Sequence, residues 1–220
     1  MERKNKSFIY KLLPKFIRTF IDENRTKKII FDHYNSLPNS SVNTEEKEAL
    51  EYLKNNRLRV FPYSFQYNYN RRDIVIHEDS KLGLHYILFE GKRLYFRRGS
   101  KPKDIQRDYN YLLIEQDIHS PHRYLTEDFN VDRDDILVDV GAAEGNLPLS
   151  VIEKVKKVYL FETDENWIEA LRATFAPWKD KVEIVNKFVS NKNEGNLVSL
   201  DKFFKERESF SFLKVDAEGA

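Results

Sequence analysis

From residue 136 onward, short apolar runs alternate along the chain with amphipathic segments. The runs are rich in β-branched and aromatic residues, which is typical of buried strands, and the segments between them have helical spacing. Strands that alternate with helices form a parallel sheet with right-handed crossovers. The pattern therefore predicts an α/β fold for residues 131–220. The predicted strands are ILVDV, KVYLFE, VEIVNKFV and SFLKVD, and the predicted helices are NLPLSVIEKV, NWIEALRATFAPW and LVSLDKFFKE.

The first part of the chain has a different pattern, and we expect residues 1–130 to form an N-terminal α+β extension. The segment TEEKEALEYLKNN predicts a helix, with Asn43 as N-cap and Glu46 at the capping-box position. Residues 58–98 predict a small β-meander with a hairpin turn at Glu90-Gly91-Lys92, and a helix is expected over 103–117. The predicted strands of the meander are LRVFPYSF, DIVIHED, LHYILFE and RLYFRR.

Residues 8–21 place apolar side chains at four-residue spacing, which predicts an amphipathic helix that Pro14 either kinks or begins. Residues 1–30 carry nine Lys or Arg against three Asp or Glu. A basic amphipathic helix can lie on an anionic membrane surface. Docking on the protein's own domain is the simpler interpretation, and peripheral membrane contact through residues 8–21, at the inner membrane face, is the alternative.

Composition narrows the classes of function. The 220 residues carry a net charge of +1, which gives no reason to expect nucleic acid as a partner. The absence of cysteine excludes disulfides, thiolate metal sites and a cysteine nucleophile. The sequence shows no membrane-span or signal-peptide pattern, so we expect a cytoplasmic protein. It also lacks the nucleophile-elbow, P-loop and zinc-protease motifs, so hydrolase and kinase functions have no support.

The first strand of the α/β part leads into a turn, GAAEGN, that is a candidate ligand site. Ligands of open parallel sheets bind at the carboxyl ends of the strands, where glycine lets the backbone approach them. Gly141 and Gly145 follow a G-x-x-x-G pattern, so the dinucleotide fingerprint G-x-G-x-x-G is absent. A cofactor without phosphates, such as S-adenosylmethionine, needs less of that geometry. A turn that binds no ligand is the alternative.

An acid at the tip of the next strand supports a cofactor site. Glu162 stands 21 residues after Gly141 and is followed by Thr163 and Asp164. A carboxylate there is well placed to accept both ribose hydroxyls of an adenosine moiety. Alternatively, Glu162 caps the helix that begins near Asn166.

Three motifs together carry a resemblance to a known family: DVGAAEGN, FETDENW and SLDKFFKERESFSFLKVDAEGA. They resemble the FkbM family of S-adenosylmethionine-dependent methyltransferases. The first motif of that family reads DVGAN-x-G, and its fourth strand carries the pattern (F/I)-K-(I/V)-D-(V/A)-E-G-A. The resemblance covers roughly residues 133–220. It implies a Rossmann-like methyltransferase fold and O-methyl transfer, for example onto sugars of polysaccharides or glycolipids.

The resemblance also implies roles for individual residues. Asp139, Gly141 and Gly145 would line the methionine end of the cofactor. The other residues of this turn would also contact the cofactor; they are Ala142, Ala143, Glu144 and Asn146. Glu162, with Thr163 and Asp164, would hold the ribose. Asp216 and Glu218 would face the methyl group or the acceptor. Asp216 is the first candidate for the base that removes the acceptor's proton, and His122 in the preceding connector is the second. Alternatively, Asp216 and Glu218 could bind a divalent cation that polarises the acceptor hydroxyl. The sequence offers no third ligand for such an ion, so no metal site is predicted.

Two departures from the family pattern matter. Ala143 stands where the family carries Asn, so a side-chain contact to the cofactor is lost. The sequence stops at Ala220, just past the fourth strand, whereas the sheet of such enzymes has seven strands. We expect a truncated form of a longer enzyme; partial substitution by the N-terminal β-rich part is the alternative. The competing function is a non-catalytic cofactor-binding or interaction module, because an unpaired apolar strand invites association.

Overall fold

The computed structural model describes residue 10 and residues 13–217, and its contacts divide the chain into two compact units. One unit comprises Met1–Tyr69 with His119–Pro121, and the other comprises Asn70–Ile118 with His122–Ala220. The packing division near residue 70 lies upstream of the predicted domain boundary after residue 130.

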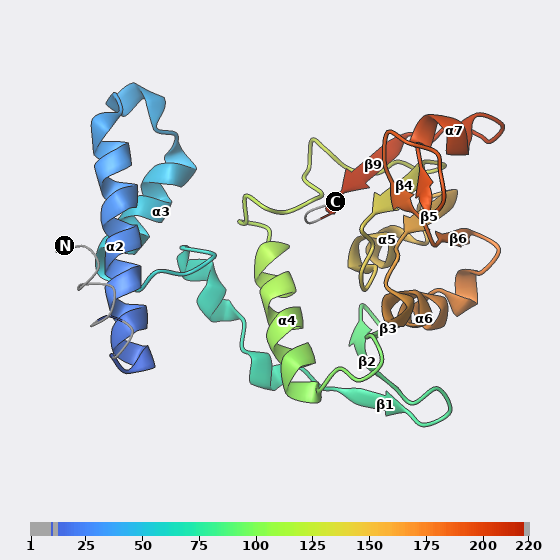
Figure 1. Cartoon of the computed structure of the whole chain (residues 1–220), viewed down its shortest axis with the longest axis horizontal. Helices are drawn as coiled ribbons and strands as arrows, with labels where there is room; N and C mark the ends of the chain where they lie inside the picture. The colour runs from blue at the N-terminus through green and yellow to red at the C-terminus, as the bar shows by residue number, and fades with distance from the viewer. Residues whose placement is uncertain (1–9, 11–12, 218–220) are drawn as a thin grey trace. The chain divides into compact units, whose positions relative to one another are not determined.

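The first unit is built on two helices, α2 (Lys15–Ser36) and α3 (Thr44–Asn55) (Figure 1). Pro14 precedes α2 as its N-cap residue, so the prediction that it marks a helix start is confirmed. Residues 8, 9, 11 and 12 of the predicted amphipathic segment lie outside the described residues. Within the described part of the chain, no helix is long and apolar enough to cross a membrane.

The predicted capping box at the start of α3 is confirmed. The Asn43 side chain accepts a hydrogen bond from the Glu46 backbone N–H, and the Glu46 carboxylate accepts one from the Asn43 N–H, both at 2.8 Å. The two contacts satisfy N–H groups that have no partner inside the helix.

The strand predicted at residues 58–65 is wrong. That segment is irregular and leads into the short 3₁₀ helices η2 (Ser64–Asn68) and η3 (Arg71–Asp73); a further 3₁₀ turn, η1 (Asn39–Ser41), precedes α3. Pro62 has no N–H to give to a strand ladder, and alternating apolar residues alone do not supply a partner strand. The meander therefore has three strands instead of four.

The second unit begins with that antiparallel meander, β1 (His77–Asp79), β2 (Leu84–Phe89) and β3 (Lys92–Tyr95). The predicted hairpin turn is confirmed: Glu90 and Gly91 both have positive φ, 49° and 78°, as a tight two-residue turn requires. The helix predicted over 103–117 is α4 (Pro102–Glu115), with proline in its first turn.

The four predicted apolar strands form one parallel sheet, as expected. They are β4 (Ile136–Val140), β5 (Lys157–Phe161), β6 (Val182–Val185) and β9 (Phe212–Val215), in the order β6-β5-β4-β9. The order reverses at β4, which has β5 on one side and β9 on the other, so the loop after β4 lies at the point where such sheets bind ligands.

Three helices connect these strands: α5 (Asn146–Val151), α6 (Glu165–Thr174) and α7 (Leu200–Phe204). A 3₁₀ turn, η4 (Ala176–Trp178), follows α6. The predicted strand VEIVNKFV is split, since its end forms β7 (Phe188–Val189), which pairs in parallel with β8 (Leu197–Val198). Residues 197–198 were predicted to be helical; β-branched Val198 instead completes this small ladder.

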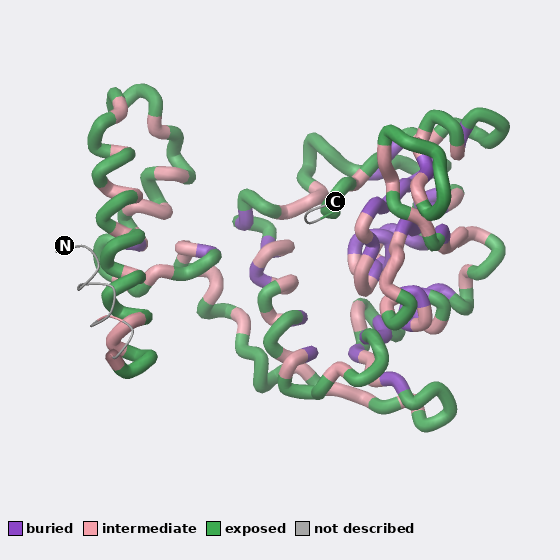
Figure 2. The backbone as a smooth tube through the Cα atoms, viewed as in Figure 1, coloured by how far each residue is buried: buried purple, intermediate pink, exposed green. Residues whose placement is uncertain are grey.

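Alternate residues of β4 and β5 enter two different cores, one on each face of the sheet. Leu137 and Leu160 pack with α5 and α6, and this core extends to Ile87 and Leu94 of the meander and to α4. On the other face, Ile136, Val138, Val140, Tyr159 and Phe161 pack around Phe204 of α7. Figure 2 shows the buried residues concentrated on these strands. Because the meander shares the first core, residues 70–118 group with the sheet.

Gly145 offers a test of this packing. Its φ is +76°, and an added Cβ would lie 2.9 Å from both Leu171 and Phe175 of α6 and its C-cap. Gly91, in the hairpin turn, has a similar φ of +78° with nothing within 4 Å. We expect Gly145→Ala to lower the free energy of unfolding by about 2–4 kcal/mol, because backbone strain and overpacking add, and Gly91→Ala by about 1 kcal/mol. Urea unfolding of both variants measures the difference; equal losses would contradict the packing role of Gly145.

Candidate functional site

A cavity of about 450 Å³ lies at the carboxyl ends of β4 and β5, within the size range of small-molecule sites. The connector before β4 and the end of α4 complete its wall through Tyr124, Leu112 and Glu115. Most of the residues predicted from the sequence line it. They are Gly141, Ala142, Ala143, Glu144, Asn146, Glu162, Thr163 and Asp216.

Other predicted residues do not line this cavity. Gly145 packs against α6, and Asp139 is buried in β4 beneath the turn. Asp164 caps α6 by accepting a hydrogen bond from the Asn166 N–H at 2.8 Å. His122 is exposed on the connector. Glu218 lies outside the described residues.

The turn after β4 is shaped by its neighbours in the sheet. Gly141 has a φ of +76°, and a Cβ at this position would lie 2.3 Å from the carbonyl oxygen of Asp216 at the end of β9. The N–H groups of Gly141 and Ala142 both donate to the Phe161 carbonyl of β5, at 3.0 and 3.2 Å. Glycine at 141 is therefore required by the close approach of β9, whether or not a ligand is bound.

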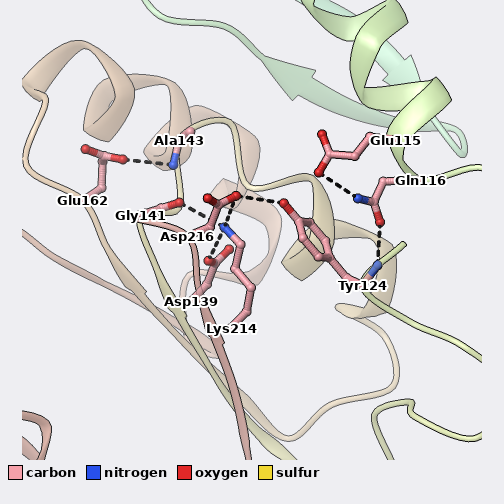
Figure 3. Close-up of polar contacts among 9 residues, drawn as sticks. All are labelled: Glu115, Gln116, Tyr124, Asp139, Gly141, Ala143, Glu162, Lys214 and Asp216. Carbon is pink, nitrogen blue, oxygen red and sulfur yellow. Dashed lines mark hydrogen bonds and ion pairs between the residues drawn. The ribbon is translucent and has the colours of Figure 1, made fainter. Parts of the chain in front are cut away.

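The Glu162 carboxylate links the tip of β5 to the glycine turn (Figure 3). One oxygen accepts from the Ala143 N–H at 2.9 Å, and the other accepts from the N–H groups of Thr163 and Asp164 at 2.7 and 2.9 Å. Glu162 thus holds Ala143, whose φ is +44°, in the left-handed region. A carboxylate has about four lone-pair positions, so Oε2 can accept one further hydrogen bond from the cavity.

Lys214 of β9 is a cation at the base of the site. Its ammonium lies 3.0 Å from Asp139 Oδ1 and 3.8 Å from Asp216 Oδ2, and it donates to the Gly141 carbonyl at 3.1 Å. Asp139 is 1% exposed, and burial raises its pKa to about 6 although Lys214 opposes the rise. The 3.0 Å contact is an ion pair without hydrogen-bond alignment, and no donor in the described residues is aligned with Asp139 Oδ1.

Tyr124 connects this group to the connector before β4. Its hydroxyl donates to Asp216 Oδ2 at 2.9 Å, and its ring centroid lies 5.5 Å from the Lys214 ammonium. Burial, followed by the negative charges of Glu115 and Asp216, raises the pKa of Tyr124 well above its usual value. Tyr124 therefore stays protonated and acts as a hydrogen-bond donor to Asp216.

Glu144 is a further carboxylate that lines the cavity, in addition to Glu115, Glu162 and Asp216. It is half-buried, and burial raises its pKa to about 7, against the attraction of Lys214 and reinforced by Asp139 and Glu115. Among the described residues, no basic side chain forms an ion pair with it. Glu144 is thus able to exchange a proton near neutral pH.

Sequence reasoning missed two residues of this arrangement. Lys214 stands inside the fourth strand motif, and a lysine flanked by apolar strand residues is a signal that a buried acid lies opposite. No local pattern marks Tyr124, because its partner Asp216 is 92 residues away. Within the described residues, no group of three His, Asp or Glu side chains is arranged to hold a metal ion.

No family model and no curated protein matches the chain. Several solved structures resemble parts of it, among them the following two. Methyltransferase FkbM from Methylobacillus flagellatus KT is 13% identical over 54% of this chain and 37% of its own, with a TM-score of 0.38. Precorrin 8W decarboxylase from Methanobacterium thermoautotrophicum is 24% identical over 24% of this chain and 30% of its own, with a TM-score of 0.22. The match thus spans about a third of each structure, 37% and 30%, and likeness of this degree carries no argument about function.

The buried charge of Asp139 predicts a specific pH dependence of stability. Its pKa is raised from 3.8 to about 6, so between these values the folded state binds a proton that the unfolded state releases. The bound proton therefore contributes to the free energy of unfolding. This contribution is fully present at low pH and is lost as the pH rises through about 6, at roughly 1.4 kcal/mol per pKa unit. We expect the melting temperature of Asp139→Asn, measured by circular dichroism, to fall less than that of the wild type between about pH 4.5 and pH 7.5.

The exposed Asp128→Asn variant serves as the control for that measurement, because it removes a carboxylate that is not buried. Its melting temperature should follow the wild-type pH dependence. An unchanged pH dependence in Asp139→Asn would show that the Asp139 charge costs the folded state nothing.

Proposed function

We propose that the chain carries the cofactor site of an S-adenosylmethionine-dependent methyltransferase of the FkbM kind, which transfers a methyl group to a hydroxyl oxygen, in particular of a sugar. The observation that carries the proposal is the cavity at the switch point of the sheet. The glycine turn after β4 forms one wall of it, and Glu162 at the tip of β5 forms another. This is the place where an open parallel sheet binds an adenosine-containing ligand.

The charges of the cavity fit a cationic cofactor. Four carboxylates line it, and two ammonium groups accompany them. An excess of negative charge in a partly buried site favours a sulfonium cation over a phosphate-bearing ligand. The carboxylates are Glu115, Glu144, Glu162 and Asp216, and the ammonium groups are those of Lys187 and Lys214.

The residues present can be assigned to parts of the cofactor. Glu162 Oε2 has room for one ribose hydroxyl, while its other contacts keep the carboxylate fixed. The Lys214 ammonium suits the carboxylate of the methionine end. The bound cofactor supplies an electrophilic methyl group on a sulfonium, so the protein needs only to align the acceptor and to remove its proton.

Two carboxylates are available for proton removal. Asp216, the base that the sequence predicts, accepts a hydrogen bond from Tyr124 and lies beside Lys214, and these contacts orient it. Glu144 has a pKa of about 7, which is better matched to a base working at neutral pH. His122, predicted as the second candidate, would have to approach from its exposed position on the connector.

The proposal predicts binding of S-adenosylhomocysteine, measured by calorimetric titration. We expect micromolar binding by the wild type and a loss of affinity of about ten-fold or more in Glu162→Gln, because a charge-assisted hydrogen bond to the ribose is removed. Glu165→Gln is the matched control, since Glu165 lies in the same segment outside the cavity lining.

Circular dichroism of each variant separates loss of the site from loss of the fold. No binding by a folded wild-type chain would contradict the proposal. Equal binding by wild type and Glu162→Gln would show that Glu162 does not hold the ribose. That result would count against the proposed cofactor site.

A further inference from the structure

A second cavity, of about 550 Å³, adjoins the first. Leu112, Glu144 and Trp167 line both, so the two cavities share a wall. The remaining lining comes from residues 96–101 between β3 and α4, from α4 itself and from the start of α6. A ligand in the second cavity therefore lies against the site that we assign to the cofactor.

Aromatic rings form one side of the second cavity. The ring centroid of Phe96 lies 6.4 Å from that of Trp167 and 6.5 Å from that of Tyr109. Trp167 is partly exposed, whereas Phe96 and Tyr109 are buried. A partly exposed indole that packs against a buried ring is a platform for the apolar face of a ligand ring.

The charged residues of the cavity divide into two groups. Arg98 and Arg107 are committed to protein carboxylates: Arg98 donates to Glu169 at 2.8 Å, and Arg107 donates to Asp104 and Asp108 at 3.0 and 2.8 Å. These two cations are thus neutralised by the protein itself, and Arg107 is shared between two carboxylates, so neither arginine is available to an anionic ligand.

Arg97 and Lys101 are the second group. The Arg97 guanidinium lies 5.5 Å from the Trp167 ring centroid, and its ion pair with Asp164 is long, at 3.7 Å. Lys101 forms no ion pair within the described residues, and it precedes the first turn of α4. Two cations thus remain beside the aromatic platform without close neutralisation.

We propose that the second cavity binds the methyl acceptor, and that the acceptor is a sugar carrying an anionic group, carboxylate or phosphate, held by Arg97 and Lys101. The inference rests on the proposed function, because only a methyl donor in the first cavity makes the second an acceptor site. Arginine suits either anion, since its planar fork binds their oxygens in pairs. The sugar ring lies on Trp167.

Glu144 orients the acceptor within this cavity. A carboxylate in the shared wall repels an anion and accepts a hydrogen bond from a hydroxyl. The acceptor therefore directs a hydroxyl toward Glu144 and the first cavity, while its anionic group stays with Arg97 and Lys101. A sugar without an anionic group lacks the contact with Arg97 and Lys101.

The test is a ligand-observed NMR titration of the full chain, with S-adenosylhomocysteine present, using D-glucuronate, glucose 6-phosphate and D-glucose as probes. We expect at least one anionic sugar to bind about five-fold or more tightly than glucose, through charge-assisted contacts. The Arg97→Ala/Lys101→Ala variant should lose that preference. A preference for glucuronate alone identifies a carboxylate ligand, and one for glucose 6-phosphate alone identifies a phosphate.

The matched control is Arg133→Ala/Lys181→Ala, which removes the same charge at positions that line neither cavity. It should keep the preference. If the first variant does not fold, Lys101→Glu, at an exposed position, replaces it and should reverse the preference.

Three outcomes would overturn the inference: equal binding of all three sugars, an unchanged preference in Arg97→Ala/Lys101→Ala, or an equal loss in the control. Calorimetry with S-adenosylhomocysteine on the same sample separates the two proposals. Cofactor binding without anion preference overturns this inference alone. Anion preference in a folded chain that does not bind S-adenosylhomocysteine overturns the proposed function, and with it the acceptor role of the second cavity, and leaves only an anion-binding cavity at Arg97 and Lys101.

Discussion

The site depends on one partly buried cation, the ammonium of Lys214. Two carboxylates, Asp139 and Asp216, lie at 3.0 and 3.8 Å from it, at an edge where strands β4 and β9 end together. Without a positive charge there, the buried Asp139 carboxylate would be repelled by the more exposed carboxylate of Asp216 with nothing to offset it. Even with it, burial dominates at Asp139 and raises its pKa to about 6. The edge of the sheet therefore carries a charge arrangement that costs stability and suits a binding site.

The backbone at this edge is held by its neighbours before any ligand enters. Gly141 passes so close to the Asp216 carbonyl that no side chain fits, and Glu162 fixes the turn through the Ala143 N–H. A preorganised turn lowers the ordering cost of binding, since its N–H groups and the cavity wall already have their positions. The glycine and the acid thus have structural roles that are compatible with a cofactor role.

The two cavities differ in charge, and Glu144 lies where they meet. In the lining of the first, carboxylates outnumber ammonium groups, whereas the second has Arg97 and Lys101 beside an aromatic platform. A cationic donor and an anionic acceptor would each find a complementary environment, and Glu144, whose pKa is raised to about 7, would be able to take up the proton that the acceptor hydroxyl loses. This charge separation unites the proposed function with the proposed acceptor class.

The sequence by itself determined the elements whose signals are local. The alternation of apolar runs and amphipathic segments predicted the parallel sheet, the Asn43–Glu46 spacing predicted the capping box, and Glu90-Gly91 predicted the hairpin turn. It failed at residues 58–65, because an alternating apolar pattern does not reveal whether a partner strand is available. The motif positions Gly141, Glu162 and Asp216 were also found from local pattern alone.

Only the tertiary structure decided which groups meet at the site. Tyr124 reaches Asp216 across 92 residues, and Lys214 reaches the Gly141 carbonyl across 73, so no spacing rule connects them. The pKa values of Asp139 and Glu144 follow from burial, which is a property of the packed chain. Gly145 carried the same local signal as Gly141, yet packing against α6 assigned it to the core. Residue type and spacing specify the elements, whereas distance and dielectric, which decide the chemistry, exist only once the elements have packed.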